Sequence, residues 1–100
     1  MSKEQFQFLI RFLNRMADDG RLNTSHISLC FAMIICWNDQ KNKLPFKISR
    51  KILMDYSKIC SISTYHICIK DLVAFGLISY VPSYDSYQGT LVRLLVRKNN

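Results

Sequence analysis

Apolar side chains recur along the chain at two different periods, and the order of those periods predicts the secondary structure. Apolar residues three and four apart predict four helices. These span residues 3–17, 25–39, 49–57 and 61–75. Alternating or β-branched apolar residues predict three short strands. These span residues 46–48, 77–81 and 90–96.

The first predicted helix has a wider apolar arc than packing against one small core requires. One stripe comprises Phe6, Leu9, Ile10, Leu13 and Met16. Phe8 and Phe12 lie four apart and form a second stripe beside it. Because this surface exceeds what one core can cover, we expect Phe8 and Phe12 to contribute to a two-fold dimer.

The second predicted helix is apolar almost all the way round, from Ile27 to Trp37, which indicates a central position in the fold. Ser25 is the expected N-cap, and we expect His26 to lie on the surface of the first turn. Trp37 is expected in the core.

The third and fourth helices are separated by a tight turn, which predicts a helix-turn-helix over residues 49–76. Ser49 and Ser61 are the expected N-caps, and Gly76 is the expected stop of the fourth helix. The inner face of the third helix is expected to comprise Ile52, Leu53 and Tyr56, and Ile59 is expected to point inward from the turn.

A β-hairpin over residues 77–97 follows directly, which is the order of a winged helix-turn-helix. The predicted fold class is therefore α+β and mainly helical, with an extra N-terminal helix within residues 1–20 and a C-terminal hairpin wing. We expect residues 1–100 to form a single domain.

The fourth helix separates into two faces by helical spacing. The inward face is expected to comprise Tyr65, Cys68, Ile69, Leu72 and Phe75. The outward face is expected to comprise Ser63, Thr64, His66, Ile67 and Lys70. A polar front half and an apolar rear half suit a helix whose N-terminal residues enter the DNA major groove while its rear packs on the core.

Each outward residue has a chemistry that DNA can use. Ser63, Thr64 and His66 can hydrogen-bond to bases or phosphates, although His66 fits a partly buried polar position equally well. Ile67 can meet a thymine methyl group and Lys70 a phosphate. The free amides near Ser61 at the helix N-terminus form a further phosphate site.

The chain carries a net charge of +7, which implies an anionic partner. Six cations lie within residues 41–58, opposed only by Asp55. Those expected to contact phosphates are Lys43, Lys47, Arg50, Lys51 and Lys58. An ordinary solvated face remains the alternative for any one of them.

The predicted wing loop contains Tyr84, Tyr87 and Gln88 but no basic residue. Tyrosine hydroxyls can donate to phosphates, although either tyrosine can instead pack back onto the hairpin. Arg93 and Arg97 are expected on one face of the last strand, either near a phosphate or as plain surface charges.

The stretch "STYHICIKDLVAFGLISY" resembles the recognition helix and hairpin of winged helix-turn-helix proteins. Together, "SHISLCFAMIICWN", "FKISRKILMDYSKICSISTYHICIKDL" and "YVPSYDSYQGTLV" are similar to small winged-helix proteins of bacterial mobilizable and conjugative transposons, over most of residues 25–96. The resemblance implies DNA binding during transposition, excision or their regulation. Ile67 departs from the pattern, because such helices often carry a lysine or arginine there.

No catalytic or metal-binding pattern is found in the sequence. Cys60, His66 and Cys68 lie close together, but no fourth ligand completes a zinc site. We expect no enzyme activity, no metal and no cofactor. With no secretory signal at the start, the thiols are expected to be reduced and the protein cytoplasmic. The longest apolar run, residues 29–37, is about half the length that spans a bilayer.

The sequence thus predicts sequence-specific binding of double-stranded DNA by a homodimer, with half-sites about 34–36 Å apart. The role would be that of a transcriptional regulator or an accessory factor of a mobile genetic element, with a recombination or transposition protein as a further partner. The alternative is a protein-interaction module of a larger replication or recombination complex. A membrane-surface helix over residues 5–16 is a third interpretation.

Overall fold

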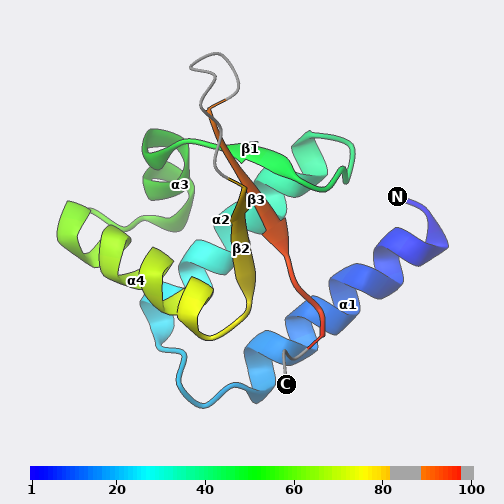
Figure 1. The fold of residues 1–100 in the computed structure, drawn as a ribbon, viewed down its shortest axis with the longest axis horizontal. Coiled ribbons are helices and arrows are strands. Elements are labelled where there is room, and N and C mark those ends of the chain that lie inside the picture. The colour runs from blue at the N-terminus through cyan, green and yellow to red at the C-terminus, as the bar shows by residue number, and fades with distance from the viewer. Residues whose placement is uncertain (82–88, 98–100) are drawn as a thin grey trace.

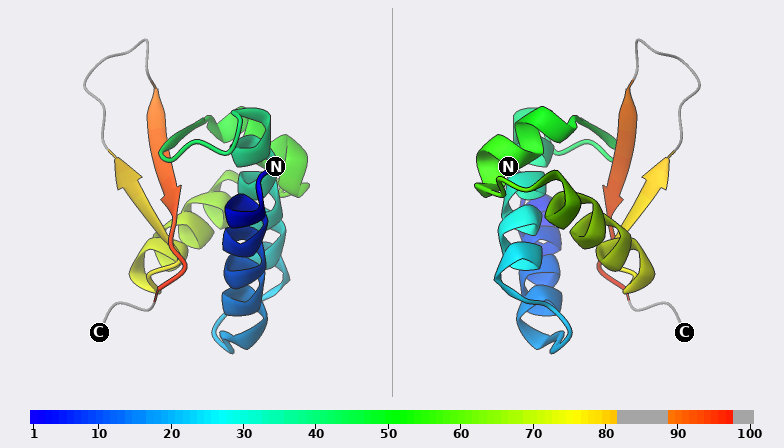
Figure 2. Two further views of the ribbon diagram at one scale, coloured as in Figure 1. Left: turned by 90° about the vertical axis from the view of Figure 1, so that its right-hand side faces the viewer. Right: turned by 90° about the vertical axis from the view of Figure 1, so that its left-hand side faces the viewer.

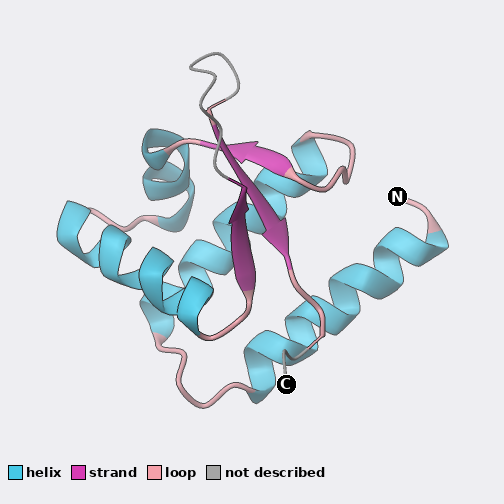
Figure 3. Ribbon diagram, in the orientation of Figure 1, coloured by secondary structure: helices cyan, strands magenta, loops and turns pink. Residues whose placement is uncertain are grey.

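The computed structural model describes residues 1–81 and 89–97, and within them the fold is α+β and mainly helical (Figures 1 and 3). The helices are α1 (Lys3–Asp18), α2 (Thr24–Asp39), α3 (Arg50–Ser57) and α4 (Ile62–Ala74). The strands are β1 (Phe46–Ile48), β2 (Ile78–Val81) and β3 (Thr90–Leu94). The order and type of all seven elements are those that the periodicity predicts, with bounds that differ by at most two residues.

The three strands form one antiparallel sheet in the order β1-β3-β2. Phe46 pairs with Val92 and Ile78 with Leu94, so that both edge strands pair with β3. Figure 2 shows the sheet at one side of the molecule and the α1–α2 pair at the other, with α4 reaching from the helices to the sheet. The backbone of Lys47 in β1 bonds the side-chain amide of Gln40, which covers the open edge of that strand.

One hydrophobic cluster joins the helices to the sheet. Its fully buried large side chains include Trp37 and Leu29 from α2, Leu53 from α3, Leu72 from α4 and Val92 from β3. Burial of a side chain of this size contributes about 1.5–3 kcal/mol relative to leaving it in water. In the described part of the chain, no helix has both the length and the apolar character needed to cross a bilayer.

α1 packs on the core through the Phe8 and Phe12 edge of its apolar arc, which is the edge that the sequence predicts as the dimer contact. Phe12 and Met16 are buried, and the half-buried ring of Phe8 lies 5.4 Å from that of Trp37, centroid to centroid. The prediction that Phe12 forms a dimer contact is wrong, because the core of its own chain covers this side chain completely. Phe6 and Ile10, on the opposite edge of the arc, are the exposed residues.

α2 begins one residue earlier than predicted and has a different cap. The side chain of Asn23, not Ser25, accepts hydrogen bonds from the amides of the first turn. Phe31 and Ile35 are exposed, so the described residues leave the outward face of this apolar helix uncovered. The prediction of a surface position for His26 is also wrong, because its side chain is buried.

The predicted caps of α3 and α4 and the predicted stop of α4 are confirmed. Ser49 caps α3 and Ser61 caps α4, and Gly76 adopts the left-handed conformation with φ of 77°. Ile59 in the turn is buried, as expected. The predicted inner face of α3 is only partly right, because Leu53 is buried whereas its neighbours Ile52 and Tyr56 are exposed.

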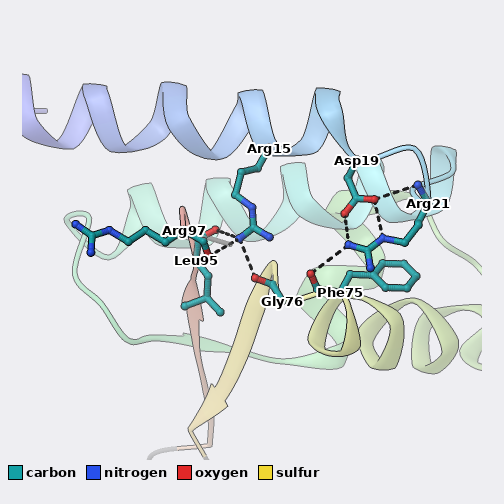
Figure 4. A network of polar contacts seen from close by, with 7 residues as sticks. All are labelled: Arg15, Asp19, Arg21, Phe75, Gly76, Leu95 and Arg97. Atoms are coloured by element: carbon teal, nitrogen blue, oxygen red, sulfur yellow. Dashed lines mark hydrogen bonds and ion pairs between the residues drawn. The ribbon is translucent and has the colours of Figure 1, made fainter. Parts of the chain in front are cut away.

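Arg15 of α1 fastens the two ends of the hairpin to the helical layer (Figure 4). Its Nη1 donates to the carbonyl oxygens of Gly76 at 2.8 Å, Leu95 at 2.7 Å and Arg97 at 3.4 Å. Burial lowers the pKa of this guanidinium from its ordinary value. β3 ends at Leu94, so Arg97 lies beyond the strand and does not share a strand face with Arg93, contrary to the prediction.

A second arginine connects the end of α1 to the end of α4. Arg21 forms a bidentate pair with Asp19 at 2.7 and 2.9 Å, and its guanidinium lies 4.2 Å from the ring centroid of Phe75 (Figure 4). The hydrogen bonds from Arg21 hold the pKa of Asp19 at about 2. The end of α4 is therefore tied to the residues that directly follow α1.

Candidate nucleic-acid interface

The exposed face of α4 is the one that the sequence predicts. Ser63, His66, Ile67 and Lys70 are exposed, and Thr64 is half-buried. The side chains on the opposite face, Tyr65, Cys68, Ile69 and Leu72, are buried in the core, with Phe75 half-buried behind them. His66 is accordingly a surface residue and not a buried polar filler.

Ser61 and Ser63 begin the exposed face at the N-terminus of α4. The Ser61 hydroxyl oxygen accepts from the amide of Thr64 at 3.2 Å and lies 3.5 Å from the hydroxyl of Ser63. The first turn of α4 contains no acidic side chain. Since an uncompensated helix N-terminus carries partial positive charge, this end of α4 favours an anion.

A buried histidine fixes the position of α4 against α2. The backbone N–H of Asn23 donates to Nδ1 of His26 at 2.9 Å, so this ring nitrogen is the acceptor. Nε2 therefore carries the hydrogen and donates to Asp71 at 2.9 Å. This bond directs the carboxylate of Asp71 toward α2 and holds α4 in place.

The five cations predicted to contact phosphates are all exposed. They lie in the loop before β1 (Lys43), in β1 (Lys47), in the first turn of α3 (Arg50 and Lys51) and in the turn before α4 (Lys58). The structure brings Arg50 and Lys51 together with His66 along one groove, and the other three lie outside its lining.

This groove, of about 680 Å³, runs between the first turn of α3, the front of α4 and the two strands β2 and β3. Its polar lining comprises Ser49, Arg50, Lys51, Tyr65, His66, Tyr80 and Thr90. The rings of Tyr65 and His66 meet edge to face, with centroids 5.3 Å apart. This contact orients the imidazole at the mouth of the groove.

Two tyrosines of this groove were not predicted as site residues. Burial, together with the neighbouring Tyr65, raises the pKa of Tyr80 to about 12. Burial also raises the pKa of Tyr65, and the positive charge of Arg50 opposes that shift. Both hydroxyls therefore keep their hydrogen at neutral pH and can donate. The apolar spacing of α4 marks Tyr65 only as a core residue, and the pairing of β2 with β3 that places Tyr80 has no local sequence signal.

The other predicted positions divide into those that the structure describes and those that it does not. Arg93 is exposed in the second half of β3, opposite Ser79. The predicted wing residues Tyr84, Tyr87 and Gln88 lie outside the described residues, and their roles stay predictions.

Within the described ranges, no cluster of three or more histidine, cysteine or acidic side chains is placed to hold a metal ion. Cys30, Cys36 and Cys68 are buried, and burial raises the pKa of Cys30 to about 12. Cys60, in the turn between α3 and α4, is exposed. A thiol whose pKa is this high remains protonated, so it is a weak nucleophile and a poor metal ligand.

Comparisons of the chain with protein-family models, with curated proteins and with solved structures found no match. The functional argument therefore rests on the residues of the chain and their arrangement.

Proposed function

We propose that this protein binds double-stranded DNA as a winged helix-turn-helix, with α4 as the recognition helix. The observation that carries the proposal is the groove in which the polar front of α4 meets the cationic first turn of α3. Phosphate contacts position such a protein on the duplex, and base contacts from the recognition helix give specificity.

The arrangement of the elements supports this proposal. α3 and α4 are joined by a short turn, and β2 and β3 pair in antiparallel fashion directly after α4. In a helix-turn-helix the second helix presents its N-terminal residues to base edges. Ser63, Thr64 and His66 occupy those positions here, and Ile67 and Lys70 follow one turn later.

The charge distribution supports it as well. Arg50 and Lys51 lie in the first turn of α3 and Lys58 in the turn before α4, and only Asp55 opposes the cations of residues 41–58 within that stretch. Each phosphate neutralised by such a cation releases a bound counterion, which contributes about −0.9 to the slope of log affinity against log salt. DNA binding through this surface is therefore strongly salt-dependent.

We assign the protein the role of a cytoplasmic transcriptional regulator or an accessory factor of a mobile genetic element. The resemblance of residues 25–96 to winged-helix proteins of mobilizable and conjugative transposons favours this role. A recombination or transposition protein is the further partner that this role implies.

The proposal includes a homodimer, now through a corrected surface. Phe6 and Ile10 on α1 and Phe31 and Ile35 on α2 are exposed and carry no charge. α1 and α2 lie side by side, so these residues belong to one helical layer (Figure 2). Because each copy carries a charge of +7, contact through apolar side chains avoids adding repulsion between cations.

The competing function is that of a protein-interaction module. The exposed Ile62 and Ile67 on α4 favour it, because a partner protein can cover apolar side chains that DNA leaves largely in water. In that case the hydroxyls and the imidazole of α4 contribute little to the interaction.

A mobility-shift assay with mixed-sequence duplex at low and moderate salt tests the proposal. Retardation should appear at low salt and weaken as salt rises. The double variant Thr64→Ala/His66→Ala should bind DNA more weakly, and the control Gln7→Ala/Asn14→Ala, on the exposed face of α1, should bind as the native chain does. Absence of retardation, or retardation that does not weaken as the salt concentration rises, would contradict DNA binding through this charged surface. Equal affinity of the two double variants would favour the protein-interaction function.

A further inference from the structure

The first turn of α3 has an unusual distribution of charge. Its first two residues are Arg50 and Lys51, and it contains no acidic side chain. A helix N-terminus carries a partial positive charge and normally favours acidic neighbours. Two cations at this position repel that charge, so the first turn is electrostatically unfavourable unless an anion lies beside it.

The amides of the same turn are only partly satisfied by the chain. Amides of the first helical turn have no partner within the helix. Within the described residues, the Ser49 side chain caps the amide of Ile52 at 3.1 Å. The amides of Arg50 and Lys51 precede that cap and remain available to a ligand.

The hydroxyl of a largely buried tyrosine lies in the same groove. Tyr65 is only 5% exposed and lines the groove beside Arg50 and Tyr80. No residue of the described chain accepts or donates a hydrogen bond at its hydroxyl. The ring is buried, whereas the hydroxyl is not enclosed and can donate to a ligand in the groove.

We propose that the groove formed by the first turn of α3, Tyr65 and Tyr80 is a phosphate site that holds one phosphate of the DNA backbone. The inference rests on the proposed DNA binding for the identity of the ligand, but not for the site itself. Two cations and two amides can only donate, and the two neutral tyrosine hydroxyls can donate as well, which suits the oxygens of a phosphoryl group. A phosphate there compensates the first turn of α3 and gives the Tyr65 hydroxyl its acceptor.

The same donors would hold a phosphodiester of DNA or a free phosphate ion, so the test has two arms. In the first, inorganic phosphate is titrated into the native protein at constant ionic strength, and the backbone amide signals are followed by NMR. Saturable shifts confined to Arg50, Lys51 and the residues around Tyr65 are expected. Equal shifts from acetate at matched ionic strength, or no localised shift, would overturn the site.

In the second arm, Tyr65→Phe is compared with the control Tyr56→Phe, an exposed tyrosine of α3 outside the groove lining, in duplex binding. A hydrogen bond to a charged group corresponds to a loss of about tenfold in affinity for Tyr65→Phe. The salt slope should stay that of the native chain, because no cation is removed. Equal affinity of the two variants would overturn the assignment to backbone phosphate.

Tyr80→Phe provides the second measurement if Tyr65→Phe perturbs the core, because Tyr80 is more exposed and its ring is retained. It too should weaken duplex binding without changing the salt slope, and native affinity would count against the site. The two proposals fail separately. If the native protein binds phosphate in the groove but does not bind duplex, the DNA function alone is refuted. If the Tyr65→Phe and Tyr80→Phe variants both bind duplex with full affinity, the phosphate site alone is refuted.

Discussion

His26 on α2 donates its Nε2 hydrogen to the carboxylate of Asp71 on α4, 2.9 Å away, although the two residues are 45 positions apart in the chain. The imidazole also accepts the backbone N–H of Asn23, so a single buried ring joins the start of α2 to the second half of α4. The orientation of the proposed recognition helix therefore depends on this ring as well as on apolar packing.

Replacement of Asp71 by alanine is expected to destabilise the protein. The Nε2–H of His26 would lose its acceptor inside the core, at a cost of about 1–3 kcal/mol in the free energy of unfolding. Asp71→Asn should cost less, because the amide oxygen still accepts. Urea denaturation followed by circular dichroism measures both. The control is Asp55→Ala on the exposed part of α3, and a loss no larger than that of the control would contradict the role of the bond.

Arg15 provides a second prediction, because one guanidinium serves three backbone carbonyls at the two ends of the hairpin segment. Arg15→Ala leaves these oxygens without their donor and should lower the free energy of unfolding by about 2 kcal/mol or more. Arg11→Ala is the matched control on the same helix, since its side chain is exposed, and should change stability by less than about 0.5 kcal/mol. The two variants are compared by thermal and urea unfolding, and similar losses would refute the fastening role.

The features that local sequence predicts well are those that depend on neighbours in the chain. Ser49 and Ser61 cap their helices because a serine hydroxyl reaches an amide three residues on, and Gly76 ends α4 because it adopts positive φ without strain. The inward face of α4 follows from its period in the same way. These signals act within a few residues, so the bounds of α3 and α4 could be predicted from sequence alone.

The errors concern choices that distant residues decide. On α1 the apolar arc is wide, and the ring of Trp37, far along the chain, determines that Phe8 and Phe12 face the core while Phe6 does not. His26 is buried because Asp71 accepts its hydrogen. Tyr65 and Tyr80 line the same groove only once the sheet has formed, and no local sequence pattern predicts that they lie close together.

The four cysteines should differ in reactivity as their burial differs. In the native protein only Cys60 is exposed, whereas Cys30, Cys36 and Cys68 are buried with raised pKa values. Because the thiolate is the reactive form, one thiol should react rapidly with an aromatic disulfide reagent at neutral pH, and the others only on unfolding. The Cys60→Ser variant should lose the fast phase alone. A fast phase that persists in this variant would contradict the described burial.

Lys70 is the cation on the exposed face of α4, and its proposed phosphate contact has a measurable signature. Lys70→Gln should weaken duplex binding and reduce the magnitude of the salt slope by about 0.9. The control Lys3→Gln removes an equal charge from the exposed start of α1 and should leave the slope unchanged. Fluorescence anisotropy at several salt concentrations gives both slopes. If the two variants reduce the slope equally, the effect is one of net charge and not of a contact at α4.

The dimer prediction distinguishes two edges of one helix. Light scattering of the native protein at micromolar concentration should give about twice the chain mass of 11.7 kDa. Phe6→Ser/Ile10→Ser should give the chain mass with native stability, because both side chains lie outside the core. Phe12→Ala instead creates a cavity and should cost about 3–5 kcal/mol in unfolding. A native chain that is monomeric under these conditions would contradict the dimer. A Phe6→Ser/Ile10→Ser variant that remains dimeric would contradict the assignment of the dimer contact to the exposed edge of α1. The exposed pair Phe31 and Ile35 on α2 would then be the next apolar surface to replace.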